Sequence, residues 1–151
     1  MVVHYQRPGI PTRRILNPLV AFLTRRLGLS IRGSRVLEVA GRKTGQPRRV
    51  PVNLLTLEGD SYLVAARGET EWVRNVRAAG GRLALLVGRR RREFQAEELV
   101  DADKPAVLRP YLRRWKAEVG AFFLGVGPDS TDDELLAVAG LHPTFRLTPI
   151  D

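Results

Sequence analysis

The sequence contains no cysteine, and its only histidines are His4 and His142. The lack of cysteine excludes disulfides, thiol catalysis and cysteine metal sites. With two histidines so far apart in the chain, we expect neither a metal site nor a hydrolase triad with a histidine base. No segment approaches the roughly 20 consecutive apolar residues that a membrane-spanning helix needs. The segment MVVHYQRPGIPTRR also has no apolar core of the signal-peptide type, so we expect a cytoplasmic protein.

The length and composition are those of one folded domain. The chain has 151 residues, of which 44% are hydrophobic and 27% are charged. A chain of this length can bury a hydrophobic core without metals or crosslinks. We therefore expect a single domain over residues 1–151. The oligomeric state is not fixed by these features, and a homodimer is compatible with them.

Positive charge dominates the sequence. Lysine and arginine number 25 against 16 acidic residues, for a formal net charge of +9. This balance predicts an anionic partner, which is a phosphate-bearing cofactor, a nucleic acid or a membrane surface. Nucleic acid is the weaker alternative because the chain has no zinc-finger spacing, RNA-recognition signature or clear helix-turn-helix, and its aromatic residues lie in apolar runs.

Residues 17–28 are predicted to form a short amphipathic helix. It begins at Asn17-Pro18 and ends at Gly28, with an apolar stripe that includes Phe22 and Leu23 opposite Arg25. Such a stripe is typical of a helix packed on a barrel and equally of a helix at a membrane surface. Peripheral membrane contact is therefore one alternative for this segment.

Short runs rich in β-forming residues predict antiparallel strands over about residues 35–100. These runs are RVLEVA, RVPVNLLTL, SYLVAA, RLALLVG and REFQAEELV. A helix over 69–79 interrupts them, and the region 103–140 is predicted to be helical with a break or kink at Pro110. Because the segment TFRLT can supply a last strand, we predict an α+β fold in which helices flank a barrel.

The segment GRKTGQPRRVP, residues 41–51, is predicted to be an anion-binding turn. Two glycines bracket Arg42, Lys43 and Thr44, and Arg48 and Arg49 follow at the start of the next strand. Backbone amides, a hydroxyl and up to four cations can therefore converge on phosphate. The segment matches neither a Walker A loop nor a dinucleotide-binding motif. The alternative is a solvated basic hairpin turn.

Several motifs occur in an order that resembles the deazaflavin-dependent nitroreductase-like family. They are GRKTGQPR, the strand YLVAA, Arg67-Gly68 and a helix with Trp72 and Asn75, over about residues 15–100. The resemblance implies a split β-barrel like that of the FMN-binding pyridoxamine-phosphate-oxidase group. It also implies a reductase that binds coenzyme F-420 and passes a hydride to a small hydrophobic acceptor, namely a quinone, a nitro compound or an activated double bond. The alternatives are an FMN-binding reductase of the same fold and a non-catalytic binder of a fatty acid or another hydrophobic or anionic ligand.

The resemblance also implies a set of cofactor-binding residues. The coenzyme's phosphate and acidic tail are assigned to Arg42, Lys43, Thr44 and Arg48. The deazaflavin ring is assigned to Ala65, Ala66, Arg67 and Gly68, with Trp72 and Asn75 nearby. In each case simple packing or solvation is the competing interpretation, with Trp72 a core residue and Asn75 a helix-surface residue. Because such a cofactor carries the chemistry itself, no catalytic residue is assigned.

An apolar segment after the predicted third helix is the candidate substrate wall. The segment AFFLGVGPD follows a helix with Tyr111 and Trp115, and we expect it to fold over the deazaflavin ring. The residues assigned to this substrate pocket are Tyr111, Trp115, Phe122 and Phe123. The competing prediction is that both phenylalanines plug the end of the barrel. Tyr5, Tyr62 and Tyr111 are candidate proton donors, with a packing role as the alternative for each. The arginine run 89–92 is predicted to be a solvated hairpin tip, with an acidic cofactor tail, nucleic acid or lipid as the functional alternatives.

Overall fold

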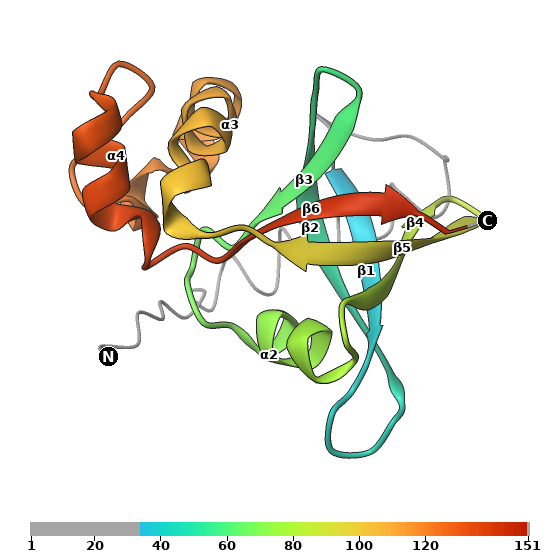
Figure 1. The fold of residues 1–151 in the computed structure, drawn as a ribbon. Helices are drawn as coiled ribbons and strands as arrows, with labels where there is room; N and C mark the ends of the chain where they lie inside the picture. The colour runs from blue at the N-terminus through green and yellow to red at the C-terminus, as the bar shows by residue number, and fades with distance from the viewer. Residues whose placement is uncertain (1–33, 151) are drawn as a thin grey trace.

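The computed structural model describes residues 34–150 and shows a closed barrel of six strands in the order β1-β2-β3-β6-β5-β4 (Figure 1). Every pair of neighbouring strands is antiparallel. The strands are β1 Ser34–Ala40, β2 Pro47–Leu57, β3 Asp60–Val64, β4 Arg82–Val87, β5 Arg90–Glu98 and β6 Thr144–Pro149. The predicted α+β barrel is thus confirmed, whereas the helix predicted over residues 17–28 lies outside the described residues.

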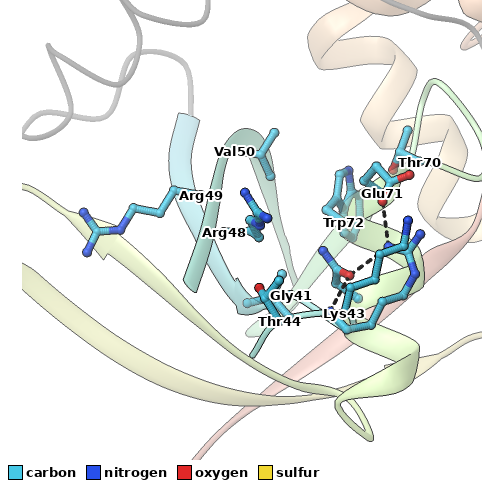
Figure 2. A pocket seen from close by; sticks show the side chains of 12 residues that line it. Gly41, Lys43, Thr44, Arg48, Arg49, Val50, Thr70, Glu71 and Trp72 are labelled. Atoms are coloured by element: carbon cyan, nitrogen blue, oxygen red, sulfur yellow. Dashed lines mark hydrogen bonds and ion pairs between the residues drawn. The ribbon is translucent and has the colours of Figure 1, made fainter. Parts of the chain in front are cut away.

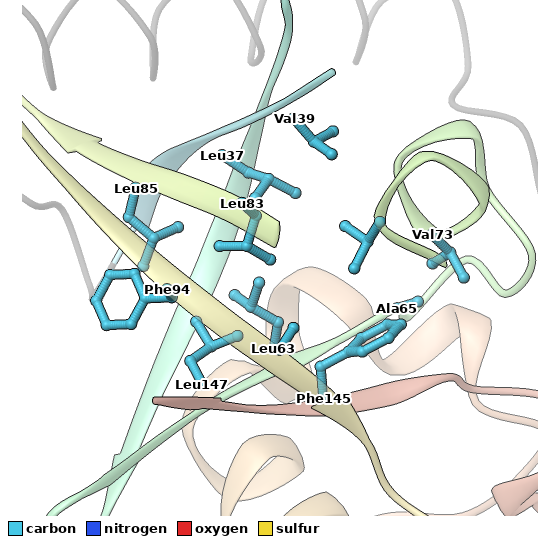
Figure 3. Close-up of a cluster of buried hydrophobic side chains, with 12 residues drawn as sticks. Leu37, Val39, Leu63, Ala65, Val73, Leu83, Leu85, Phe94, Phe145 and Leu147 are labelled. Carbon is cyan, nitrogen blue, oxygen red and sulfur yellow. The ribbon is translucent and has the colours of Figure 1, made fainter. Parts of the chain in front are cut away.

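The barrel interior is filled by every second residue of its strands (Figure 3). Leu37 and Val39 of β1 face Leu83 and Leu85 of β4, and Phe145 of β6 lies across the same core. Side chains alternate between the two faces of a strand, so this period-two pattern encloses a continuous apolar core. The remaining interior residues from the strands are Leu63, Phe94, Ala96 and Leu147, and Ala65 joins them directly after β3.

Helix α2, Glu71–Ala78, connects β3 to β4 and contributes Val73 and Val76 to the barrel core. This helix confirms the predicted insertion. The chain then reverses through Gly80 and Gly81, both of which have a positive φ. A Cβ atom at Gly81 would lie 2.3 Å from the backbone oxygen of Ala96, so no larger residue fits there.

Helices α3, Pro105–Val119, and α4, Asp132–Ala139, form a second core against the barrel wall. Their apolar faces pack on Leu55 of β2 and Val64 of β3. The 3-10 helices η3, Asp101–Asp103, and η4, Gly120–Phe122, flank α3. Thr131 and Glu134 form a capping box at the start of α4, as the local sequence predicts. None of the helices among residues 34–150 is both long and apolar enough to span a membrane.

Two predictions were wrong about position. The backbone of α3 departs from helical geometry at Trp115, with φ −122° and ψ 20°, and not at Pro110. Pro110 is the sixth residue of α3 and lacks the N–H that would bond the Ala106 carbonyl, yet the helix continues through it and buries its apolar face on both sides of it. The arginine run is exposed as predicted, but only its first residue lies at the hairpin tip. Gly88 and Arg89 form the turn, while residues 90–92 lie in β5 because the β4–β5 ladder closes between Val87 and Arg90.

Candidate functional site

The β1–β2 connection is a compact turn. The Gly41 amide donates to the Gln46 carbonyl at 2.8 Å, and the Gly45 amide donates to the Gly41 carbonyl at 2.8 Å. Gly45 has a φ of 76°, which glycine adopts without strain. Thr44 Oγ1 accepts a hydrogen bond from the Gln46 amide at 3.2 Å. Internal bonds therefore set the shape of the turn, and the Lys43 side chain extends into solvent.

Arg42 joins this turn to helix α2. Its backbone amide and its Nη1 both donate to Oδ1 of Asn75, at 3.1 and 2.9 Å. The same Nη1 donates to Oε2 of Glu71 at 2.6 Å (Figure 2). Asn75 is 5% exposed, so it is a buried acceptor that positions Arg42 and not a helix-surface residue. The bond from Arg42 is the main cause that holds the pKa of Glu71 below its usual range.

A cavity of about 540 Å³ lies between the turn and the start of α2. Twelve residues line it, including Arg42, Glu71 and Asn75. The other nine are Val39, Gly41, Lys43, Thr44, Arg48, Arg49, Val50, Thr70 and Trp72. The cavity therefore combines the four cations of the predicted turn with one carboxylate, on a partly apolar floor.

The four cations of this cavity are not equivalent. Arg42 is bound to Glu71, and Arg49 donates to Glu38 at 2.9 Å. Figure 2 shows the Arg49 side chain extending away from the other labelled side chains. Among the described residues, Lys43 and Arg48 form no ion pair. These two cations are the ones that an anionic ligand can neutralise without breaking an existing pair.

Thr70 also indicates that this cavity is suited to an anionic ligand. It is the N-cap residue of α2, yet its side chain makes no capping bond. Its Oγ1 is buried and has no hydrogen-bond partner in the described part of the chain. A buried hydroxyl without a partner costs free energy unless something binds it. With Lys43, Arg48 and the helix start, this hydroxyl forms a donor set suited to a phosphate or carboxylate group.

A second cavity, of about 250 Å³, shares Trp72 with the first. Its other lining residues are Ser34, Pro51, Val52, Asn53, Val64, Ala65, Ala66, Arg67, Tyr111, Glu118, Val119 and Phe122. Tyr111 forms a side-chain hydrogen bond with Asn53, and burial raises the pKa of its hydroxyl well above the usual range. Tyr111 is therefore a neutral hydrogen-bonding group in a largely apolar cavity.

Trp72 both packs against the barrel core and lines the two cavities. Its ring packs against Phe145 with centroids 5.8 Å apart, and the residue adjoins the barrel core. It also forms a wall of both cavities. Because its position is fixed by the core, Trp72 is a rigid partition between the cation-lined cavity and the smaller one.

Most of the predicted cofactor residues come together around these cavities. The cation-lined cavity contains Arg42, Lys43, Thr44, Arg48, Trp72 and Asn75, and the smaller one contains Ala65, Ala66 and Arg67. Gly68 lines neither cavity. It has a φ of 88°, and its amide donates to the Ala65 carbonyl at 3.0 Å. Gly68 therefore shapes the link between β3 and α2.

The predicted substrate wall is divided by the structure. Phe122 lines the smaller cavity together with Tyr111, and the Arg67 guanidinium lies 4.2 Å from the centre of its ring. Phe123 is 2% exposed and stacks on His142, with ring centroids 3.9 Å apart. Trp115 is 1% exposed in the same core. Phe123 and Trp115 thus pack between the barrel wall and the helices and do not line the smaller cavity.

Sequence reasoning missed Asn53, Thr70 and Glu71 as site residues. Thr70 and Glu71 lie at a predicted helix start, where Thr is a common cap and Glu favours the helix dipole. Because a role in starting the helix explained both residues, the sequence did not indicate that they belong to a binding site. Asn53 is a polar residue within an apolar strand, and that interruption was the available signal. Its partner, Tyr111, is 58 positions later in the chain, so the pairing depends on the fold.

Comparisons with known proteins identify a family for most of the chain. A family model described as F420H2-dependent quinone reductase matches residues 19–122. This range includes the turn, helix α2, and the Tyr111 and Phe122 positions. A comparison with curated proteins gave no match.

Solved structures support the fold. One, described as an F420-H2 dependent reductase, has 18% identity and a TM-score of 0.52, with 78% of this chain and 95% of that chain covered. A putative pyridoxamine 5'-phosphate oxidase from Listeria innocua has 16% identity and a TM-score of 0.52, with 79% and 85% covered. A protein described as a domain-swapped dimer has 19% identity and a TM-score of 0.54, with 91% and 93% covered. These neighbours place the barrel among split β-barrel proteins.

Proposed function

Because the chain belongs to the F420H2-dependent quinone reductase family, we propose that it reduces a small hydrophobic acceptor at the junction of its two cavities. Membership makes the chain a deazaflavin-dependent oxidoreductase and agrees with the resemblance seen in the sequence. The observation that carries the proposal is the shared wall at Trp72. A charged cavity for a cofactor tail and a smaller apolar cavity for an acceptor meet at one rigid side chain.

Lys43 and Arg48 hold the coenzyme's phosphate and acidic tail in this proposal. Both are exposed cations with no ion pair in the described part of the chain, and the unpartnered Thr70 hydroxyl lies in the wall of the same cavity. Charge-assisted hydrogen bonds to phosphate are stronger than neutral ones. Arg42 and Thr44 complete the lining, with Arg42 held by Asn75.

Ala65 and Ala66 provide the surface for the flat ring. They follow β3 directly and line the smaller cavity beside Trp72. The Ala65 amide donates to the Pro143 carbonyl at 2.8 Å, which fixes the backbone there. Small side chains on a fixed backbone allow a planar ring to approach closely. The bound coenzyme supplies the hydride, so the protein has to orient the two reactants and exclude water.

The part of the smaller cavity away from Ala65 and Ala66 binds the acceptor in this proposal. Phe122, Val119 and Trp72 offer apolar surface, which suits a flat molecule such as a quinone, a nitro compound or an activated alkene. The Tyr111 hydroxyl is protonated at neutral pH, as tyrosine normally is, and burial raises its pKa further. It can therefore donate a hydrogen bond to an acceptor oxygen that gains negative charge during reduction.

The direct test is turnover with reduced coenzyme F-420 and a short-chain quinone. Oxidation of the coenzyme is followed by the return of its visible absorbance. We expect a saturable, enzyme-dependent rate with the quinone, and the same assay with a nitroaromatic and an enone ranks the three acceptor classes. No rate above the uncatalysed reaction with any of the three would contradict the proposed function.

Location and assembly form a separate part of the proposal. A cytoplasmic protein with peripheral membrane contact through the amphipathic segment 17–28 agrees with its apolar and basic composition. A homodimer agrees with the description of one structural neighbour as a domain-swapped dimer. Sedimentation with anionic vesicles tests the first part, and light scattering during gel filtration tests the second.

A further inference from the structure

Glu71 is the one acidic residue among the described residues that line the cation-rich cavity. Its carboxylate lies on Arg42, and its side chain is 68% exposed. The Arg42 bond lowers the pKa of Glu71, so the carboxylate is charged at neutral pH. A site built to bind an anion thus already contains a bound anion of its own.

The two partners of Arg42 differ in how firmly they are held. Asn75 is buried and accepts from both the backbone and the guanidinium of Arg42, so this link is part of the fold. Glu71 is largely in solvent and has freedom to turn away. An exposed ion pair contributes little to stability, so losing the Glu71 contact costs the fold little.

The Glu71 carboxylate occupies a position where a ligand anion would also bind favourably. Glu71 is in the first turn of α2, where the helix dipole and free amides attract negative charge. The neighbouring Thr70 hydroxyl is buried without a partner and lines the same cavity. Lys43 acts on Glu71 electrostatically as well. A phosphate group that binds here would meet the same donors that now attract Glu71.

We propose that Glu71 is an internal counter-ion that a phosphate-bearing ligand displaces from Arg42. This proposal rests on the proposed function and adds a residue that sets affinity. Before binding, Glu71 neutralises Arg42 and keeps the cation cluster from repelling itself. A ligand with a single weak charge competes poorly with Glu71, whereas a ligand with several negative charges also engages Lys43 and Arg48. Glu71 thereby favours polyanionic ligands over monoanions.

The test compares Glu71→Gln with Glu97→Gln. Glu97 is a matched control because it is 67% exposed, pairs with Arg146 at 3.1 Å and lies on β5, outside the cavity. Both variants lose one negative charge. Affinities for inorganic pyrophosphate and for coenzyme F-420 are measured by calorimetry and by fluorescence. We expect Glu71→Gln to bind both about five- to twenty-fold more tightly at low ionic strength, and Glu97→Gln to stay within about twofold of the wild type.

A double-mutant cycle assigns the gain to Arg42. In an Arg42→Ala background, Glu71→Gln should improve binding by no more than about twofold, because the competition for the guanidinium is gone. Unchanged or weaker pyrophosphate binding by Glu71→Gln, or no pyrophosphate binding by any variant, would overturn the counter-ion proposal. Tighter pyrophosphate binding by Glu71→Gln with no coenzyme binding by any variant would instead support it and contradict the proposed function.

Discussion

The two cavities on either side of Trp72 are built in different ways. The larger one takes its cations from a single turn, on side chains that reach solvent. The smaller one is assembled from β2, the end of β3, α3 and η4, and it shares Tyr111 with the second hydrophobic core. Changes to the lining of the first cavity should therefore have little effect on folding, whereas changes near the second should affect both the cavity and stability.

The largest expected effect is a loss of stability when the second hydrophobic core is changed. Phe123 is 2% exposed and stacks on His142, so Phe123→Ala should create a cavity and cost ~3–5 kcal/mol of unfolding free energy. Turnover per folded molecule should change little because Phe123 does not line the smaller cavity. Chemical denaturation and an activity assay at low temperature measure the two effects separately.

Leu124→Ala is the matched control, since Leu124 is the next residue and is 59% exposed. This change should leave stability within ~0.5 kcal/mol of the wild type. A Phe123→Ala protein of normal stability with altered acceptor preference would show that Phe123 is a pocket wall. Equal losses of stability for the two variants would contradict the difference in burial on which the prediction rests.

Lys43→Ala, in the larger cavity, should reduce coenzyme affinity and leave stability nearly unchanged. We expect coenzyme affinity to fall by about ten- to a hundred-fold, since a charge-assisted contact to phosphate is lost. The melting temperature should change by no more than about 2 °C because the side chain is exposed. Lys116→Ala removes the same charge from an exposed position on α3 and should leave the affinity nearly unchanged. Parallel losses in both lysine variants would mean that only overall charge matters.

Tyr111→Phe tests whether turnover can be changed without changing coenzyme affinity. The hydroxyl is bonded to Asn53, so its removal should cost about 0.5–1.5 kcal/mol of stability. Turnover with a quinone should fall while the coenzyme dissociation constant stays the same. Because burial raises the Tyr111 pKa, the wild-type rate should show no loss from ionisation of Tyr111 between about pH 9 and 11, where an unshifted tyrosine would ionise. A parallel loss of coenzyme affinity would place Tyr111 in the cofactor site.

The same comparison explains which parts of the site were readable from sequence. The strands, α2 and the basic turn follow from local patterns, and the turn residues are contiguous. The bond between Asn53 and Tyr111 and the clamp of Arg42 on Asn75 join residues distant in sequence, which only the closed barrel brings together. The kink at Trp115 was missed because tertiary packing outweighed the effect of Pro110.

The central claim is that the turn and helix α2 form a binding site for a polyanionic deazaflavin. Fluorescence titration of coenzyme F-420 against riboflavin, at low and at high salt, tests it most directly. We predict saturable binding of the coenzyme that is at least about tenfold tighter than that of riboflavin at low salt, with a difference that shrinks as salt screens Lys43 and Arg48. Equal affinities for the two compounds, with no dependence on salt, would contradict the account.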